Sequence, residues 1–229
     1  MKKYEYLIFD LDNTLLNFSQ SETNALRGIF TKYGVIYNEE TFSIYKEINH
    51  ELWQKLEEGR IKKETVLTTR FAKFFATQGI QVDGAKADDE YRKLLESRND
   101  LMTNSLELLS GLKSKGYKIF AGTNGVGRTQ RKRLANADMT QYFDNLYISE
   151  EVGFEKPDVR FFETIFTNEG IRDLTSVLMI GDSLSSDIRG ANRVGIDSIW
   201  LNNTLNSVIN DEPTYKCSNL KDIENMFNI

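Results

Sequence analysis

Two carboxylates stand two residues apart at the end of the first apolar run of the chain. Tyr4 to Phe9 is apolar, and the segment DLDNT, from Asp10 to Thr14, follows it directly. The segment therefore places two carboxylates, Asp10 and Asp12, where an open parallel sheet would meet a cleft.

Polar residues also follow two later apolar runs. Thr123 and Asn124 end one run, and Asp182 ends another, with Asp187 five residues further on. Lys156, followed by proline, opens the helical pattern between them. Because open parallel sheets bind ligands beyond the carboxyl ends of their strands, we expect these residues to meet in one cleft.

This combination of side chains supplies the parts of a phosphoryl-transfer site. Mg²⁺ takes carboxylate oxygens, and Asp10 and Asp182 are the candidate ligands. Three acids in one cleft repel one another, so a cation and Lys156 are both expected as countercharge. Each residue alone is ordinary turn chemistry or a solvated charge, and the functional interpretation depends on their order along the chain.

Five short runs rich in β-branched and aromatic residues are predicted to be buried strands. They are Tyr4 to Phe9, Tyr117 to Gly122, Leu146 to Ser149, Ser176 to Ile180 and Ser198 to Leu201. Helical patterns, including Pro157 to Asn168 and Leu184 to Val194, lie between them. Strands alternating with helices predict an α/β fold, with a parallel Rossmann-like sheet as the middle of three layers.

About a hundred residues separate the first two predicted strands, far more than the dozen or so that a crossover needs. Within this stretch apolar residues recur at helical spacing, with breaks near Gly34, Gly59 and Gly79 to Gly84. We therefore expect a catalytic core formed by residues 1–16 and 101–229, and a four-helix cap domain formed by residues 17–100.

The composition indicates a folded globular protein. Among 229 residues, 40% are hydrophobic and the net charge is −5. Arg128, Arg131, Lys132 and Arg133 cluster, but no basic stripe with interleaved aromatics predicts a polymeric nucleic-acid partner. No apolar run approaches the roughly 20 residues that cross a bilayer, so no membrane partner is expected. The single cysteine, Cys217, and the absence of an apolar leader favour a cytoplasmic location.

At the polar strand ends the sequence resembles the haloacid dehalogenase superfamily. Its four motifs match DLDNT from Asp10, Thr123 with Asn124, Lys156 with Pro157, and Asp182 with Asp187. The match spans the whole chain, and the helical insertion resembles the cap of the superfamily's small-metabolite phosphatases and dehalogenases. The resemblance implies an enzyme that uses Mg²⁺ and passes through an aspartyl-phosphate.

The resemblance also implies a role for each residue. Asp10 is the nucleophile and a metal ligand, and Asp12 is the general acid and then the general base. Asp12 also lends its backbone carbonyl to the metal. Lys156 offsets charge on Asp10 and on the phosphoryl group. Thr123 and Asn124 bind phosphate, and Asp182 completes the metal site. Asp187 contacts the metal ligands or acts on the metal through a water molecule.

Three segments resemble the bacterial pyrimidine 5′-nucleotidase branch more closely. They are the cap stretch Leu52 to Phe71, the segment TNGV from Thr123, and the segment GFEKP from Gly153. This likeness implies a nucleoside 5′-monophosphate substrate, pyrimidine before purine. It carries no information on whether the protein is a monomer or a homodimer.

Four other functions stay open at this point. A phosphomutase or a sugar-phosphate phosphatase would share every core residue. A 2-haloacid dehalogenase is disfavoured because its first motif typically lacks an acid where this chain has Asp12. A non-catalytic binding module is disfavoured because nothing required for turnover is missing.

Overall fold

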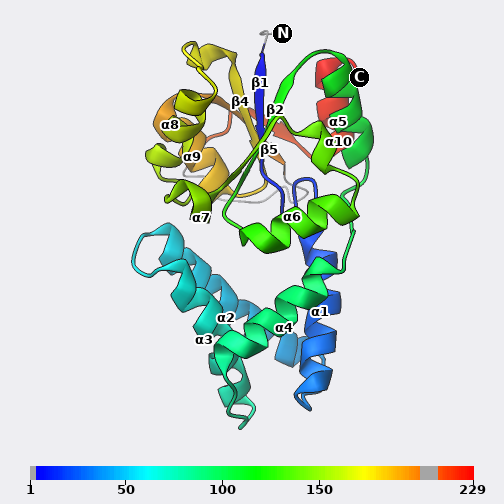
Figure 1. Cartoon of the computed structure of the whole chain (residues 1–229), viewed down its shortest axis with the longest axis vertical. Coiled ribbons are helices and arrows are strands. Elements are labelled where there is room, and N and C mark those ends of the chain that lie inside the picture. Colours follow the sequence, from blue (N-terminus) through cyan, green and yellow to red (C-terminus); the bar gives the residue numbers. More distant parts are fainter. Residues whose placement is uncertain (1–3, 202–210) are drawn as a thin grey trace. The chain divides into compact units, whose positions relative to one another are not determined.

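The protein is described by a computed structural model that covers residues 4–201 and 211–229. In these ranges six parallel strands form one sheet in the order β3-β2-β1-β4-β5-β6 (Figure 1). The strands are β1 (Tyr6–Phe9), β2 (Lys118–Thr123), β3 (Asn145–Ile148), β4 (Val177–Gly181), β5 (Asp197–Leu201) and β6 (Tyr215–Cys217). Because neighbouring strands are parallel, their carboxyl ends share one edge of the sheet.

The first five strands confirm the runs predicted from the sequence, with bounds shifted by one or two residues. The sixth strand, β6, was not predicted. It has three residues, it pairs only with β5 among the described residues, and its middle residue Lys216 is exposed. An edge strand of three residues is too short to form an apolar run that would predict it from the sequence.

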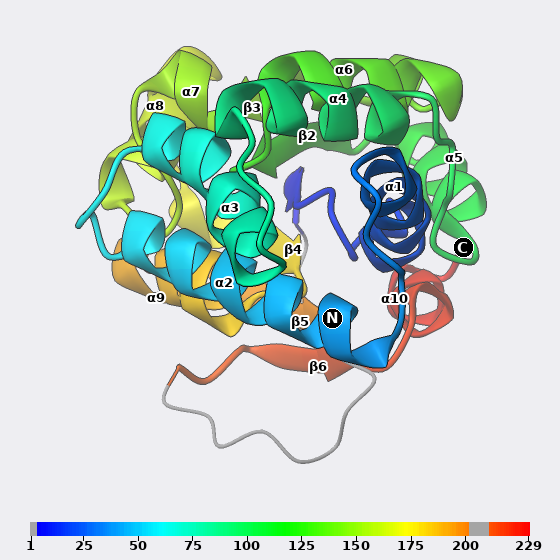
Figure 2. The same cartoon turned by 90° about the horizontal axis from the view of Figure 1, so that it is seen from below.

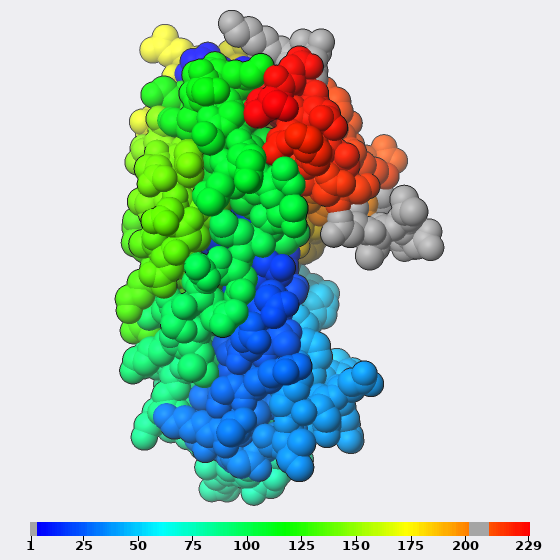
Figure 3. All heavy atoms as spheres, turned by 90° about the vertical axis from the view of Figure 1, so that its right-hand side faces the viewer, coloured from blue at the N-terminus to red at the C-terminus, as the bar shows by residue number. Residues whose placement is uncertain are grey.

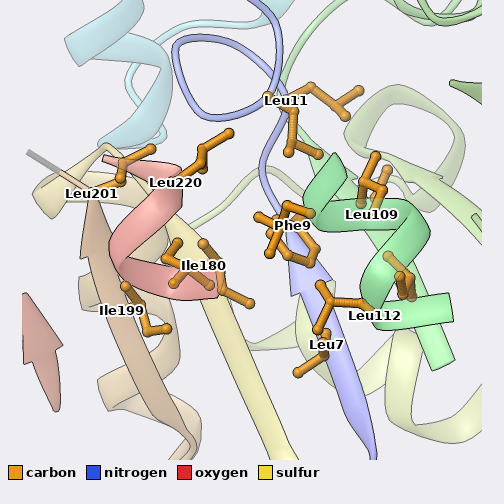
Figure 4. Close-up of a cluster of buried hydrophobic side chains, with 14 of the residues drawn as sticks. Leu7, Phe9, Leu11, Leu109, Leu112, Ile180, Ile199, Leu201 and Leu220 are labelled. Atoms are coloured by element: carbon orange, nitrogen blue, oxygen red, sulfur yellow. The ribbon is translucent and has the colours of Figure 1, made fainter. Parts of the chain in front are cut away.

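Successive residues of the central strand β1 contribute to opposite faces of the sheet. Leu7 and Phe9 belong to one buried cluster and Ile8 belongs to another, as the two-residue period of a strand requires. Figure 4 shows Leu7 and Phe9 beside Leu109 and Leu112 of a covering helix. With helices over both faces the fold is a three-layer α/β sandwich, which confirms the predicted class.

Six α-helices of the described residues belong to this sandwich. They are α5 (Ser105–Ser114), α6 (Gly127–Asn136), α7 (Ser149–Val152), α8 (Val159–Asn168), α9 (Arg189–Val194) and α10 (Leu220–Phe227). Two single 3₁₀ turns are η1 (Thr140–Tyr142) and η2 (Leu174–Ser176). Helix α10, red in Figure 3, packs against α5.

The helical pattern predicted from Leu184 to Val194 is confirmed, but its first half is not α-helical. A π-helical turn, η3 (Leu184–Ile188), precedes α9, and the amide of Ile188 donates to the Ser183 carbonyl at 3.1 Å. The π turn inserts one extra residue into the helical ladder, and such turns are frequent at functional sites. Asp187 lies within it.

The described residues form two compact units. One contains the residues up to Phe18 and those from Asn99 onward, and the other is Ser19–Arg98. The second unit is helical and is formed by α1 (Phe18–Lys32), α2 (Glu39–Glu57), α3 (Lys63–Thr77) and α4 (Gly84–Glu96). No helix within the described ranges has the length and apolar character that crossing a bilayer requires.

Local chemistry sets the ends of the four helices in this unit. Asn38 caps α2 in a capping box, because its side chain accepts from the Thr41 amide at 2.9 Å and the Thr41 hydroxyl accepts from the Asn38 amide at 3.0 Å. Gly34 and Gly59 follow α1 and α2 at positive φ, which glycine adopts without strain. Helix α3 packs against both α2 and α4 (Figure 2).

The interior of the helical unit combines aromatic rings with one buried charge network. Tyr45 and Phe71 are fully buried there, as their helical spacing predicts. Arg70 is 4% exposed, and its guanidinium donates to Asp88 at 2.7 Å and to Asn49 at 3.2 Å. Arg70 therefore forms a buried ion pair with an aspartate of the same unit.

Candidate active site

Asp10 follows directly on the central strand β1. Its amide donates to the carbonyl of Ile180 on β4 at 2.9 Å, so the backbone of Asp10 is still held by the sheet. The side chain is buried and lies 3.4 Å from the hydroxyl of Thr14. Asn13 adopts a left-handed conformation and the Leu11 carbonyl accepts from the Leu16 amide at 2.8 Å. The DLDNT segment is thus a tight loop at the carboxyl edge of the sheet.

Lys156 is fully buried and connects three parts of the core. Its ammonium group donates to Asp10 Oδ1 at 2.8 Å, to Asp187 Oδ1 at 2.6 Å and to the Gly122 carbonyl at 2.5 Å. An ammonium group has three donors, so all of them are used. Lys156 is therefore not the solvated surface lysine that a lone lysine in a sequence usually is.

Asn124 holds the backbone of Lys156 through two hydrogen bonds. Its amide nitrogen donates to the Lys156 carbonyl at 2.9 Å, and its amide oxygen accepts from the Lys156 amide at 2.9 Å. The neighbouring Thr123 hydroxyl accepts from the Gly125 amide at 3.0 Å. The side chain of Asn124 therefore positions Lys156, and the Thr123 hydroxyl lies at the end of β2.

Two further acids come from the segment after β4. Asp182 is partly buried, and the indole of Trp200 on β5 donates to its carbonyl at 2.8 Å. Asp187 is fully buried, and its second oxygen accepts from the Ser183 amide at 3.1 Å. A Cβ atom at Gly181 would lie 2.2 Å from Asp187 Oδ2. Only glycine at this position allows Asp187 to approach the end of β4 so closely.

The three acids Asp10, Asp182 and Asp187 form one cluster. One carboxylate oxygen from each lies within 4.8 Å of the others. Burial raises the pKa of Asp10 to about 7, with Lys156 opposing the effect and Asp187 and Asp12 adding to it. Burial and the charges of Asp10 and Asp187 raise the pKa of Asp182 well above its ordinary range. Burial thus opposes the ionised forms of Asp10 and Asp182 more strongly than Lys156 favours them.

The pKa of Lys156 is displaced in the opposite sense. Burial by itself would lower it, but the carboxylates of Asp10 and Asp187 raise it above the usual value for lysine. Lys156 is consequently a permanent cation at neutral pH, fixed against Asp10. A fixed cation beside a buried carboxylate stabilises negative charge that develops there during a reaction.

Asp12 contacts two residues that the sequence analysis did not select. Arg133 Nη1 donates to Asp12 Oδ1, and Gln130 Nε2 donates to Asp12 Oδ2 at 2.8 Å. Both residues lie on α6 and are 2% exposed. Arg133 was noticed only as one of a basic cluster, and Gln130 was not noticed. The available signal was their three-residue spacing on the helix that directly follows Thr123 and Asn124.

Together these residues can bind a phosphate group and a hard cation at one edge of the sheet. Carboxylate oxygens favour a hard divalent cation, and an ammonium group with a threonine hydroxyl favours phosphate oxygens. The core therefore brings together every candidate residue that the sequence suggested: Asp10, Asp12, Thr123, Asn124, Lys156, Asp182 and Asp187.

Comparison with known proteins identifies this arrangement. Residues 7–201 match the family described as haloacid dehalogenase-like hydrolase. The chain belongs to this family. The hydrolase is also similar in structure to the HAD-hydrolase YfnB from Bacillus subtilis in a magnesium-bound crystal form, with a TM-score of 0.94, 33% identity and full coverage of both chains.

Two curated relatives carry a substrate class in their names. The pyrimidine 5′-nucleotidase PynA of Streptococcus pneumoniae (strain ATCC BAA-255 / R6) is 35% identical to this hydrolase over 221 residues, which are 96% of the chain and 93% of PynA. The pyrimidine 5′-nucleotidase YjjG of Escherichia coli (strain K12) is 29% identical over 225 residues, which are 98% of each protein. The family resemblance inferred from the sequence is confirmed over the full length.

Proposed function

We propose that this hydrolase is a magnesium-dependent phosphatase that cleaves small phosphate monoesters through an aspartyl-phosphate on Asp10. The observation that carries the proposal is the position of Lys156, which lies 2.8 Å from Asp10 and 2.6 Å from Asp187 while Asp182 completes the acidic cluster. Such a group of charges suits phosphoryl transfer, in which catalysis consists mainly of positioning and electrostatic stabilisation.

In the first step an oxygen of Asp10 attacks phosphorus and the bond from phosphorus to the leaving oxygen breaks. Asp12 gives its proton to that oxygen, so an alcohol leaves instead of an alkoxide. The hydroxyl of Thr123 donates to a phosphoryl oxygen, and the positive charge of Lys156 stabilises the charge that develops on the phosphoryl group. The products of this step are the alcohol and phosphorylated Asp10.

In the second step a water molecule attacks the phosphorus atom of phosphorylated Asp10. Asp12, now a carboxylate, takes a proton from that water, and the bond from Asp10 to phosphorus breaks. Inorganic phosphate leaves, and both aspartates return to their starting states. An acid at position 12 is needed in both steps, which separates this proposal from dehalogenation.

The acidic cluster fits Mg²⁺. Its donors are hard oxygen atoms, and burial, together with the neighbouring carboxylates, raises the pKa of both Asp10 and Asp182. Asp10, Asp182 and the backbone carbonyl of Asp12 would hold the ion, with Asp187 behind them. When bound, the ion neutralises charge on the phosphate group and on the nucleophile.

We further propose that the substrate is a nucleoside 5′-monophosphate, pyrimidine before purine. The names of PynA and YjjG, and the full-length similarity of this chain to both, support that class. The unit Ser19–Arg98 is proposed as the cap domain that reads the leaving group. The experiment is phosphate release from a panel of nucleoside monophosphates and sugar phosphates, in Mg²⁺ or in chelator.

Asp10→Asn tests the mechanism within the same panel. We expect release that depends on Mg²⁺, is fastest on UMP, dUMP or dTMP, and is lost in this variant. Asp138→Asn is the matched control, because Asp138 is exposed and holds a left-handed conformation that asparagine adopts readily. Sugar phosphates as the best substrates would contradict the substrate class but keep the mechanism, and full activity of Asp10→Asn would contradict the mechanism.

A further inference from the structure

Helix α6 directs two buried polar side chains at Asp12. Arg133 and Gln130 are three residues apart, so they share one face of the helix. Arg133 Nη1 donates to Asp12 Oδ1, and Gln130 Nε2 donates to Asp12 Oδ2 at 2.8 Å. Both oxygens of the proposed general acid and base are therefore held by protein donors from one rigid element.

Gln130 also contacts the proposed phosphate-binding hydroxyl. Its Nε2 donates to Thr123 Oγ1 at 3.1 Å, and the Gly125 amide donates to the same oxygen at 3.0 Å. A hydroxyl has two acceptor sites and one donor, so an oxygen that accepts twice keeps its own O–H for another acceptor. These two contacts therefore leave the Thr123 hydroxyl able to donate to a phosphate oxygen.

The orientation of the Gln130 amide is set by its neighbours. Arg133 Nη1 donates to Gln130 Oε1 at 3.1 Å, whereas Gln130 Nε2 faces two acceptors, Asp12 and Thr123. Turning the amide over would bring donor against donor and acceptor against acceptor. Arg133 thus orders Gln130, and Gln130 orders Thr123 and Asp12 together.

The two partners differ in exposure. The side chain of Asp12 is 28% exposed, while that of Arg133 is 2% exposed and lies over the ring of Phe18 at 5.5 Å. The buried guanidinium needs the countercharge of Asp12, so the pair also stabilises the fold, whereas Asp12 at this exposure could be solvated without a partner. The buried residue supports the accessible one, which is the arrangement expected when the accessible residue reacts.

We propose that Gln130 and Arg133 are positioning residues that hold the acid–base side chain of Asp12 and orient the Thr123 hydroxyl toward phosphate. The inference rests on the proposed phosphatase function and adds two residues to it. Misplacement of a reacting group by about 1 Å can cost about 10²-fold in rate.

Substrates whose leaving groups differ in basicity can distinguish two roles for Arg133: positioning Asp12 for proton transfer, or supporting the fold alone. An alkoxide must be protonated as it leaves, whereas p-nitrophenolate leaves without a proton. The value of kcat/KM reports the first step, so we would measure it for p-nitrophenyl phosphate and for two alkyl phosphates, UMP and glucose 6-phosphate. In Arg133→Met we expect a loss of about 10- to 100-fold on the alkyl phosphates and less than about threefold on p-nitrophenyl phosphate.

Gln130→Leu should behave differently, because Gln130 also contacts Thr123. We expect a loss on both kinds of substrate, together with weaker competitive inhibition by inorganic phosphate. Arg133→Met should weaken this inhibition less, because Gln130 keeps its own contacts to Thr123 and Asp12. Arg133→Lys should recover part of the activity on alkyl phosphates. Arg131→Met is the matched control, because Arg131 lies on the same helix but is half exposed and pairs with Glu151.

The possible results test the positioning role of Gln130 and Arg133 separately from the proposed phosphatase function. Equal losses of Arg133→Met on aryl and alkyl phosphates, with phosphate inhibition unchanged in Gln130→Leu, would mean structural support alone and would overturn the inference. Wild-type activity in both variants would overturn it as well. A wild-type protein that releases no phosphate from any of the three substrates would overturn the phosphatase proposal, and the inference would fall with it.

Discussion

Lys156 and Asp187 form an ion pair in which neither side chain is measurably open to solvent, with Nζ 2.6 Å from Oδ1 and exposures of 1% and 0%. Breaking a buried pair by removing one partner leaves a charge that cannot regain its hydration, which costs about 3–5 kcal/mol. The same lysine contacts Asp10. One side chain therefore links the stability of the core to the charge on the candidate nucleophile.

Lys156→Met should lower both stability and activity. We expect the free energy of unfolding to fall by about 3–5 kcal/mol, measured in urea, and kcat to fall by about 10²- to 10³-fold. Adding Asp187→Leu to this variant should restore part of the stability, because one of the two carboxylates left without Lys156 is then removed, but should restore no activity. A double variant no more stable than the single one would contradict the ion-pair explanation.

Asp12→Asn should separate the two chemical steps. With p-nitrophenyl phosphate the first step needs no proton donor, so we expect a burst of about one equivalent of p-nitrophenol followed by very slow turnover. Intact mass spectrometry after acid quench should find one phosphoryl group on the protein, and Asp10→Asn should show neither burst nor adduct. Steady turnover of Asp12→Asn without an adduct would exclude a base at this position.

The raised pKa of Asp10, about 7 against an ordinary value of 3.8, predicts how metal-free stability depends on pH. Between these values the folded protein keeps a proton that the unfolded chain has lost, so this group makes stability fall as pH rises through the window. Asp182 acts in the same direction. We expect Asp10→Asn to be more stable than wild type in chelator, by a margin in Tm that grows as pH rises toward 7.

Mg²⁺ should reverse this difference. Because the ion binds the ionised carboxylates, it should raise the Tm of the wild type most at the upper end of the window and raise that of Asp10→Asn much less. Differential scanning fluorimetry over a pH series with Mg²⁺ or chelator measures both effects. A margin that shrinks with rising pH would show that the acidic cluster does not carry the charge inferred for it.

Gly181→Ala should displace Asp187 with little change elsewhere. The new Cβ atom would lie 2.2 Å from Asp187 Oδ2, a distance that forces the carboxylate away from Lys156 and from the Ser183 amide. We expect kcat to fall by at least about tenfold, with a lower Tm. Gly28→Ala is the matched control, since its Cβ would meet the end of the flexible, exposed Leu94 side chain at 2.9 Å. A fully active Gly181→Ala would contradict a role for Asp187.

The site residues at the carboxyl edge of the sheet could be predicted from the sequence because two independent patterns agreed there: apolar strands and the polar residues that follow them. Buried parallel strands such as Val177–Gly181 are continuous apolar runs, and the acids that follow them stand out against those runs. Asp10, Asp182 and Lys156 could thus be selected from residue type and position alone. That they meet follows from parallel pairing, which brings strand ends to one edge.

Residues that position another side chain, such as Arg133, could not be selected from the sequence in this way. Helix α6 is polar along most of its length, which is typical of a surface helix, and nothing in the letters distinguishes buried Arg133 from exposed Arg131. The distinction depends on Asp12, which lies 121 residues earlier in the chain. The π-helical turn at Leu184–Ile188 was also not predicted. It contains Asp187, whose carboxylate lies 2.2 Å from where a Cβ atom at Gly181 would be, and no local pattern in the sequence shows this approach.

The strand order has a consequence for how the protein becomes functional during synthesis. Among the described strands β1 is made first, yet its two neighbours in the sheet are β2 and β4. Asp10 and Lys156 are 146 residues apart, and Asp187 is made later still. A growing chain therefore contains the candidate nucleophile long before it contains the lysine that pairs with it, and a chain that ends before Asp187 should be less stable than the whole chain.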